Sequence, residues 1–96
     1  MEDETLQQVH AVVHGRVQGV SFRYYTVLEA ERLGIMGWVR NLPDGTVEVT
    51  AQGTPDQLQA FAEFLYRGSP AAEVTHVEST TQPLISRFAQ FSVRYG

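Results

Sequence analysis

The order in which strand patterns and helix patterns alternate along this chain restricts its fold more than any other feature. Apolar and polar residues alternate where a strand is expected, and apolar residues recur three or four positions apart where a helix is expected. A helical pattern follows the first strand pattern, and a second one follows the next two strand patterns. The strand patterns cover residues 6–14, 36–41, 47–51, 74–80 and 91–95, and the helical patterns cover residues 22–33 and 55–67.

The first six of these elements predict two split β-α-β units (βαββαβ), and the last strand pattern follows them. They would form an α+β ferredoxin-like sandwich, in which an antiparallel sheet carries two helices on one face. A chain of 96 residues is long enough for one compact core and too short for two. We therefore expect a single domain over residues 1–96, with residues 1–5 as a flexible N-terminal tail.

Local signals refine two of these elements. Thr54 and Gln57 form the pattern of a capping box at the start of the second helix. In the fourth strand pattern, Val74 and Val77 lie on opposite faces unless a β-bulge intervenes. The sequence therefore predicts a well-capped second helix and an irregular fourth strand.

The charge balance and the lack of cysteine exclude several classes of function. Seven basic residues against eleven acidic ones give a net charge of -4, which repels nucleic acid and anionic membranes. Without cysteine the chain has no disulfide, no thiolate metal site and no cysteine nucleophile. The acidic start MEDETLQQ is unlike a signal peptide, and no apolar run has membrane-spanning length. We expect a cytoplasmic monomer without nucleic acid or membrane partners.

The stretch GRVQGVSFR, residues 15–23, joins the first strand to the first helix. Gly15 and Gly19 permit a concave loop whose N–H groups bind an anion, and the helix start adds partial positive charge. Arg23 in the first turn opposes the helix dipole, but it becomes favourable when a phosphate occupies the loop. The stretch has neither a Walker ending nor the dinucleotide spacing. Spacing alone leaves an anion site and an ordinary glycine turn equally open.

Other polar residues have ordinary structural explanations by spacing alone. Asn41 precedes a Pro-Asp-Gly turn, where asparagine commonly supports the turn, although in this fold it can also face the loop. Ser21 lies where helix caps occur, and no histidine and aspartate complete a triad with it. Because His10, His14 and His76 lack a matching ligand set, we predict no metal site. The aromatic residues near the loop are expected to pack: Phe22, Tyr24, Tyr25 and Trp38.

Two separated motifs resemble those of the acylphosphatase family. They are GRVQGVSFR at residues 15–23 and GWVRNLPDGTVEV at residues 37–49, followed by a helix and a Gly-Ser-Pro segment at residues 68–70. The resemblance runs from about Val13 to the end of the chain, with the motifs in the right order and at compatible spacing. One departure is Ser69, since the family often has the glycine and the proline adjacent.

The resemblance implies an enzyme, an acylphosphatase. It would hydrolyse the carboxyl-phosphate bond of acyl phosphates to a carboxylate and inorganic phosphate, without a metal or other cofactor. By position, Arg23 is similar to the family's phosphate-binding arginine and Asn41 to its water-orienting asparagine. The implied mechanism is in-line attack of a water held by Asn41 on a phosphoryl group held by Arg23 and loop amides. The loop that matches the family's phosphate cradle comprises Gly15, Arg16, Val17, Gln18, Gly19 and Val20.

Two further functions fit parts of the pattern. A non-enzymatic module that kept the anion pocket would bind phosphate without turnover. An RNA-binding domain of similar fold is disfavoured by the net charge and by the lack of a basic, aromatic sheet face. The expected partners are therefore a small-molecule acyl phosphate as substrate and inorganic phosphate as product ligand.

Overall fold

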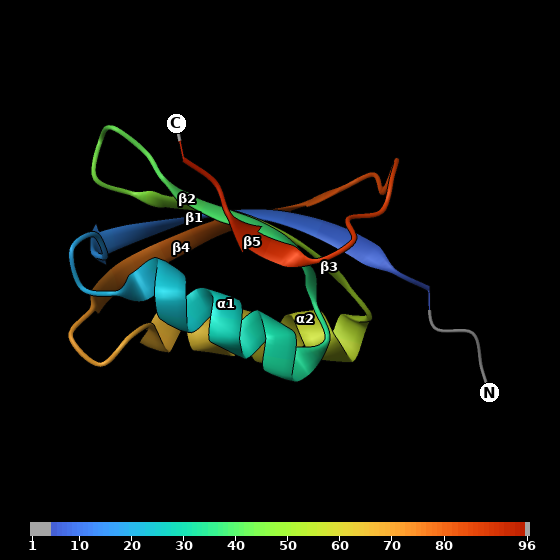
Figure 1. The fold of residues 1–96 in the computed structure, drawn as a ribbon, viewed down its shortest axis with the longest axis horizontal. Coiled ribbons are helices and arrows are strands. Elements are labelled where there is room, and N and C mark those ends of the chain that lie inside the picture. The colour runs from blue at the N-terminus through green and yellow to red at the C-terminus, as the bar shows by residue number, and fades with distance from the viewer. Residues whose placement is uncertain (1–4, 96) are drawn as a thin grey trace.

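A computed structural model describes residues 5–95 of the chain as two helices and a five-stranded sheet. The strands lie in the order β4-β1-β3-β2-β5, and Figure 1 shows both helices on the same side of the sheet. The predicted α+β ferredoxin-like fold is confirmed. The predicted tail lies outside the described residues except for Thr5. In chain order the elements are β1 (Gln7–Arg16), α1 (Phe22–Leu33), β2 (Met36–Asn41), β3 (Val47–Gly53), α2 (Pro55–Arg67), β4 (Glu73–Gln82) and β5 (Phe91–Val93).

The sheet is mixed, so the prediction of a wholly antiparallel sheet is wrong. β1 to β4 pair antiparallel, whereas β5 runs parallel to β2, with Val39 opposite Val93. β4 pairs with β1 and forms one edge of the sheet, so the edge at β2 is still free. The chain crosses to that edge, where β5 pairs with β2 and runs in the same direction. Gln52 of β3 holds this crossing, since its side chain donates to Ser86 O at 2.7 Å and accepts from Phe88 N at 3.0 Å.

A β-bulge brings the two valines of β4 to the core. The register between β1 and β4 shifts between His14 and Gly15, and Gly15 pairs with Val74. As a result Val74 and Val77 both pack against the core, which is the outcome expected with a bulge. Gly15 is required here, since its φ is +122° and a Cβ would lie 2.1 Å from Glu73 O.

The core lies between the helices and one face of the sheet. The opposite face, called the open face below, carries mainly polar side chains, and Trp38 and Gln52 are buried on it. On this open face the Glu48 carboxylate contacts His10 Nε2 and Arg40 Nε, each at 2.6 Å. Within residues 5–95, neither helix is long and apolar enough to cross a membrane. The largest fully buried side chains are those of Phe22, Ile35, Val13, Val17, Val39, Val47, Val49 and Thr26.

The four aromatic residues near the loop divide into two pairs. Phe22 and Trp38 are buried, as predicted. Tyr24 and Tyr25 are 61% and 37% exposed, so the prediction that they pack is wrong for both. Positions four apart share a helix face, so Phe22 and Thr26 face the core while the two tyrosines lie outside that face. Their rings contact each other instead, with centroids 5.3 Å apart.

Candidate active site

The entrance of α1, residues 21–24, is built unlike an ordinary helix start. Ser21 occupies the N-cap position in the left-handed region (φ 62°, ψ 26°), and its side chain makes no capping hydrogen bond. The predicted capping role of Ser21 is therefore wrong. The first turn also contains no acidic residue. The partial positive charge of the first backbone N–H groups is thus not compensated by a side chain of this turn.

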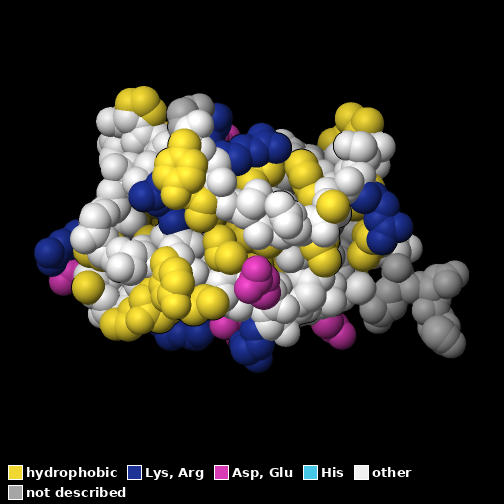
Figure 2. All heavy atoms as spheres, in the orientation of Figure 1, with side chains coloured by type: hydrophobic (Ala, Val, Ile, Leu, Met, Phe, Trp, Pro, Cys, Tyr) yellow, Lys and Arg dark blue, Asp and Glu magenta, His cyan; other side chains and the backbone are white. Residues whose placement is uncertain are grey.

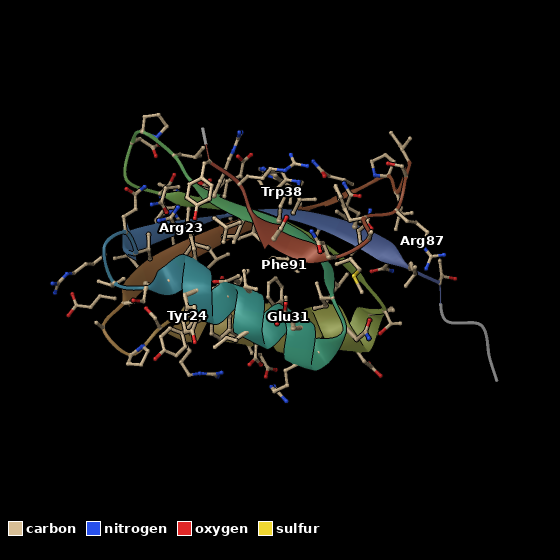
Figure 3. All side chains as sticks on the ribbon, viewed as in Figure 1. Arg23, Tyr24, Glu31, Trp38, Arg87 and Phe91 are labelled. Atoms are coloured by element: carbon tan, nitrogen blue, oxygen red, sulfur yellow. The ribbon has the colours of Figure 1, made fainter. Side chains whose placement is uncertain are left out.

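Arg23 adds a full positive charge to this entrance. Its guanidinium lies 5.4 Å from the centroid of the Tyr95 ring, and the side chain is partly buried. Figure 3 shows Arg23 between the start of α1 and the sheet. Within residues 5–95 no carboxylate forms an ion pair with it. The contact with the Tyr95 ring involves the flat side of the guanidinium group and none of its N–H groups, which point outward in the guanidinium plane. These N–H groups therefore remain available to an anion.

The loop before α1 is held from two sides. Gln18 Nε2 donates to the carbonyl oxygens of Leu42 and Thr46 at 2.8 Å each. Ser69 is 2% exposed, and its hydroxyl donates to Val20 O at 2.7 Å. All three bonds join the loop to segments distant in the sequence, so they fix the backbone that leads into α1. The sequence did not predict this role for Ser69, because no local pattern relates it to the loop.

The six residues predicted to cradle a phosphate occupy different places. Gly15 and Arg16 belong to β1 and pair with β4. Val17 is 1% exposed and lines the cavity described below together with Gly19. Gly19 has a φ of +74° and open space where a Cβ would lie. The remaining two make the hydrogen bonds just described.

Asn41 ends β2 with an unsatisfied acceptor. Its Oδ1 is buried and accepts no hydrogen bond within residues 5–95. The turn that follows is closed without it, because Leu42 N donates to Thr46 O at 2.9 Å and Gly45 N donates to Leu42 O at 3.1 Å. A buried acceptor without a partner costs about 1–3 kcal/mol. Such a group is typical of a site that binds water or a ligand.

A cavity of about 490 Å³ brings these features together. Arg23 reaches it from the start of α1 and Asn41 from the end of β2. Figure 2 shows arginine and hydrophobic side chains next to each other at the end of the molecule where α1 begins. The volume of the cavity suits a phosphate with a small acyl group. The cavity is lined by Val17, Gly19, Ser21, Phe22, Arg23, Tyr24, Val27, Asn41, Val93 and Tyr95.

The acidic side chains of the adjacent β2–β3 hairpin, Asp44 and Glu48, form hydrogen bonds outside the cavity. The Asp44 carboxylate accepts from the hydroxyl and the backbone N–H of Thr46, and these bonds lower the pKa of Asp44. Burial acts to raise the pKa of Glu48, but hydrogen bonds from His10 and Arg40 outweigh it and lower that pKa. Neither carboxylate lines the cavity, and none of the lining residues is acidic. The site is therefore suited to an anion.

The fold and the cavity together define a small α+β domain with a cavity suited to an anion at a helix start. Comparison with known proteins agrees: the acylphosphatase family model matches residues 9–93. The acylphosphatase of Bifidobacterium longum is 49% identical over 94 residues, which are 97% of this chain and 97% of that protein. The acylphosphatase of Bordetella avium is 44% identical over 92 residues, 96% of this chain and 98% of that protein.

A solved structure supports the same conclusion. The crystal structure of acylphosphatase from Bacillus subtilis matches with a TM-score of 0.90 at 41% identity, covering 95% of this chain and 100% of that one. The chain belongs to the acylphosphatase family. The family resemblance and the prediction of an acylphosphatase enzyme are thereby confirmed.

Proposed function

We propose that this enzyme hydrolyses the carboxyl-phosphate bond of acyl phosphates, with Arg23 binding the phosphoryl group and Asn41 positioning the attacking water. The observation that carries the proposal is the convergence of an arginine and a buried, unsatisfied amide oxygen on one cavity. Arg23 offers a planar set of donors that fits two phosphoryl oxygens. The uncapped N–H groups of α1 add donors at the same place.

The reaction needs positioning and charge stabilisation more than reactive side chains. A water molecule that donates to Asn41 Oδ1 attacks phosphorus in line with the carboxylate leaving group. The new P–O bond forms as the bond to the acyl oxygen breaks, and the electron pair leaves on the carboxylate. The proton of the water passes to a phosphoryl oxygen, so the products are a carboxylate and inorganic phosphate. Because a carboxylate is already a stable leaving group, no protein acid is required.

The apolar part of the cavity supports an aromatic or aliphatic acyl group. Val27 and Val93 line it beside the rings of Tyr24 and Tyr95. These side chains offer van der Waals contact to a benzoyl or short alkyl group and no charge that would repel it. Benzoyl phosphate is therefore a suitable test substrate.

The decisive experiment compares hydrolysis of benzoyl phosphate by the wild type and by Arg23→Gln, Asn41→Ala and Arg87→Gln. By analogy with arginines that stabilise transferring phosphoryl groups, Arg23→Gln should lower kcat/KM by about 10³ to 10⁵. Asn41→Ala should lower kcat by about 10² or more, because the water loses its position. Arg87→Gln removes the same charge from an exposed side chain at the far end of the molecule (Figure 3) and should leave turnover unchanged.

Unchanged turnover in folded Arg23→Gln and Asn41→Ala variants would contradict the proposal. Phosphate binding by the wild type without any turnover would favour a non-enzymatic module instead. The cytoplasmic location, the monomeric state, the single domain and the independence from metal stay predictions.

A further inference from the structure

Two histidines and a glutamate form a cluster on the open face of the sheet. His14 of β1 pairs directly with His76 of β4, and their rings stack with centroids 4.0 Å apart. Glu78 follows two positions along β4, so it points to the same face as His76. Its carboxylate oxygens lie 3.4 Å from His14 Nε2 and 3.8 Å from His76 Nε2. None of the three residues lines the cavity that contains Arg23.

His14 differs from His10, which lies on the same face of β1. His10 Nε2 is satisfied by Glu48 Oε2 at 2.6 Å. His14 Nε2 is buried and makes no hydrogen bond within residues 5–95. A buried imidazole nitrogen without a hydrogen bond, close to other nitrogen and oxygen atoms that can ligate a metal, is suited to bind a metal ion.

We propose that His14, His76 and Glu78 bind a zinc ion. Their ligand atoms all lie within 4.8 Å of one another. Tetrahedral zinc, with bonds of about 2.0–2.2 Å, separates neighbouring ligand atoms by about 3.3–3.6 Å. The 3.4 Å between His14 Nε2 and Glu78 Oε1 fits this range already, whereas His76 Nε2 lies 3.8 Å from the other carboxylate oxygen, Oε2, so the His76 side chain has to move toward the ion.

Binding requires one side-chain rearrangement. The planes of the two imidazoles differ by only 11°, so their nitrogen lone pairs do not yet converge on one point. The His76 side chain is 55% exposed and can turn toward the ion, whereas the 29% exposed His14 is more firmly held. Two imidazoles and one carboxylate form a ligand set that suits zinc, with water in the fourth position. This pairing was not predicted because the two histidines lie far apart in the chain.

The proposed ion would join the edge strand β4 to β1 next to the bulge. The three ligands come together only in the folded chain, so zinc would stabilise the folded state by mass action. The hydrolysis proposed above uses no metal, so this site would support the structure and not the reaction. The two proposals can therefore fail independently.

The test is calorimetric titration of untagged, chelator-treated protein with Zn²⁺ near neutral pH. The wild type should bind one ion per chain, and Co²⁺ should give the absorption of a tetrahedral site. His76→Ala and Glu78→Gln should each weaken Zn²⁺ binding by at least about tenfold. His10→Ala is the matched control, because it removes a histidine of the same sheet face outside the cluster, and it should keep the wild-type affinity.

Thermal unfolding provides a second readout on the same variants. Zn²⁺ should raise the Tm of the wild type and of His10→Ala, and it should not raise that of His76→Ala. His76 is more than half exposed, so its replacement should leave the fold intact by circular dichroism. Absence of saturable Zn²⁺ binding to the wild type would overturn the proposal. Equal affinity in the wild type and in a His14→Ala/His76→Ala double variant would overturn it as well.

Discussion

The two helices of this protein begin in opposite ways. At the α2 entrance, residues 54–57, the Thr54 hydroxyl accepts from Gln57 N and Gln57 Oε1 accepts from Thr54 N. Pro55 and Asp56 follow the cap. At the α1 entrance, Ser21 is in the left-handed region without a capping bond. Each of these residues at α2 stabilises the helix. Within the described residues, the start of α1 instead leaves its first backbone N–H groups without a side-chain cap and the Arg23 charge without a carboxylate. We interpret the difference through the proposed phosphate site, which needs free donors and positive charge at the start of α1, whereas the start of α2 serves helix stability.

The largest expected effect concerns the support of the α1 entrance. Gly15→Ala places a Cβ 2.1 Å from Glu73 O at a φ of +122°, so it should lower the free energy of unfolding by about 3 kcal/mol or more. Gly45→Ala is the matched control, because its φ of +94° brings a comparable backbone strain while its Cβ would meet nothing within 4 Å, so it should lose less stability than Gly15→Ala. Urea denaturation measures both. Equal losses in the two variants would show that the close approach to Glu73 O adds nothing to the backbone strain at Gly15.

Ser69→Ala tests whether the loop is held from outside the helix. The change leaves Val20 O without its 2.7 Å hydrogen bond in a partly buried setting, which should cost about 1 kcal/mol or more. The kcat/KM for benzoyl phosphate should also fall, because the backbone leading into α1 loses one of its hydrogen bonds. A stable variant with wild-type kinetics would remove Ser69 from this account.

The predictions from sequence succeeded where the determining residues are close together in the chain. The spacing of apolar residues predicted the bounds of α1 and β2, and Thr54 with Gln57 predicted the capping box that the structure contains. The bulge that lets Val74 and Val77 share a face was anticipated from their spacing. Periodicity and capping are local properties, so a single sequence carries them.

The predictions failed where distant segments decide the outcome. The parallel pairing of β5 depends on which sheet edge is free after β4 has paired. Gln18 and Ser69 hold the loop through carbonyls far along the chain, and no spacing rule connects them. Ser21 has the position and residue type of a helix cap, but its backbone is left-handed, with a φ of 62°, and its side chain makes no capping hydrogen bond. For Arg23 and Asn41, spacing alone left alternatives open, and the roles proposed for them come from the family resemblance.

A matched pair of substitutions compares the two entrances directly. Thr54→Ala removes both a cap and a capping box and should lower the free energy of unfolding by about 1 kcal/mol. Ser21→Ala removes no hydrogen bond and should change it by less than about 0.5 kcal/mol. Chemical denaturation under identical conditions gives both values. A loss at Ser21 as large as that at Thr54 would contradict the contrast.

An acid titration provides a small reference effect on the open sheet face, away from both entrances. Because the pKa of Glu48 is lowered from 4.5 in the folded state, its stabilisation is present above that value and is lost as the pH falls through the lowered pKa. Glu48→Gln should therefore be less stable than the wild type at neutral pH by about 1 kcal/mol or less. The gap should shrink at pH values below the lowered pKa. A gap that stays constant with pH would show that it does not come from the charge.

Calorimetric titration of the wild type and Arg23→Gln with inorganic phosphate, with unfolding measured in phosphate-free buffer, tests whether α1 begins as a phosphate site. If α1 begins as a phosphate site, phosphate affinity should fall by at least about tenfold in Arg23→Gln. Without phosphate, the variant should be as stable as the wild type or slightly more stable, since a cation at a helix start is unfavourable. Unchanged phosphate affinity, or a clear loss of stability in phosphate-free buffer, would contradict the account.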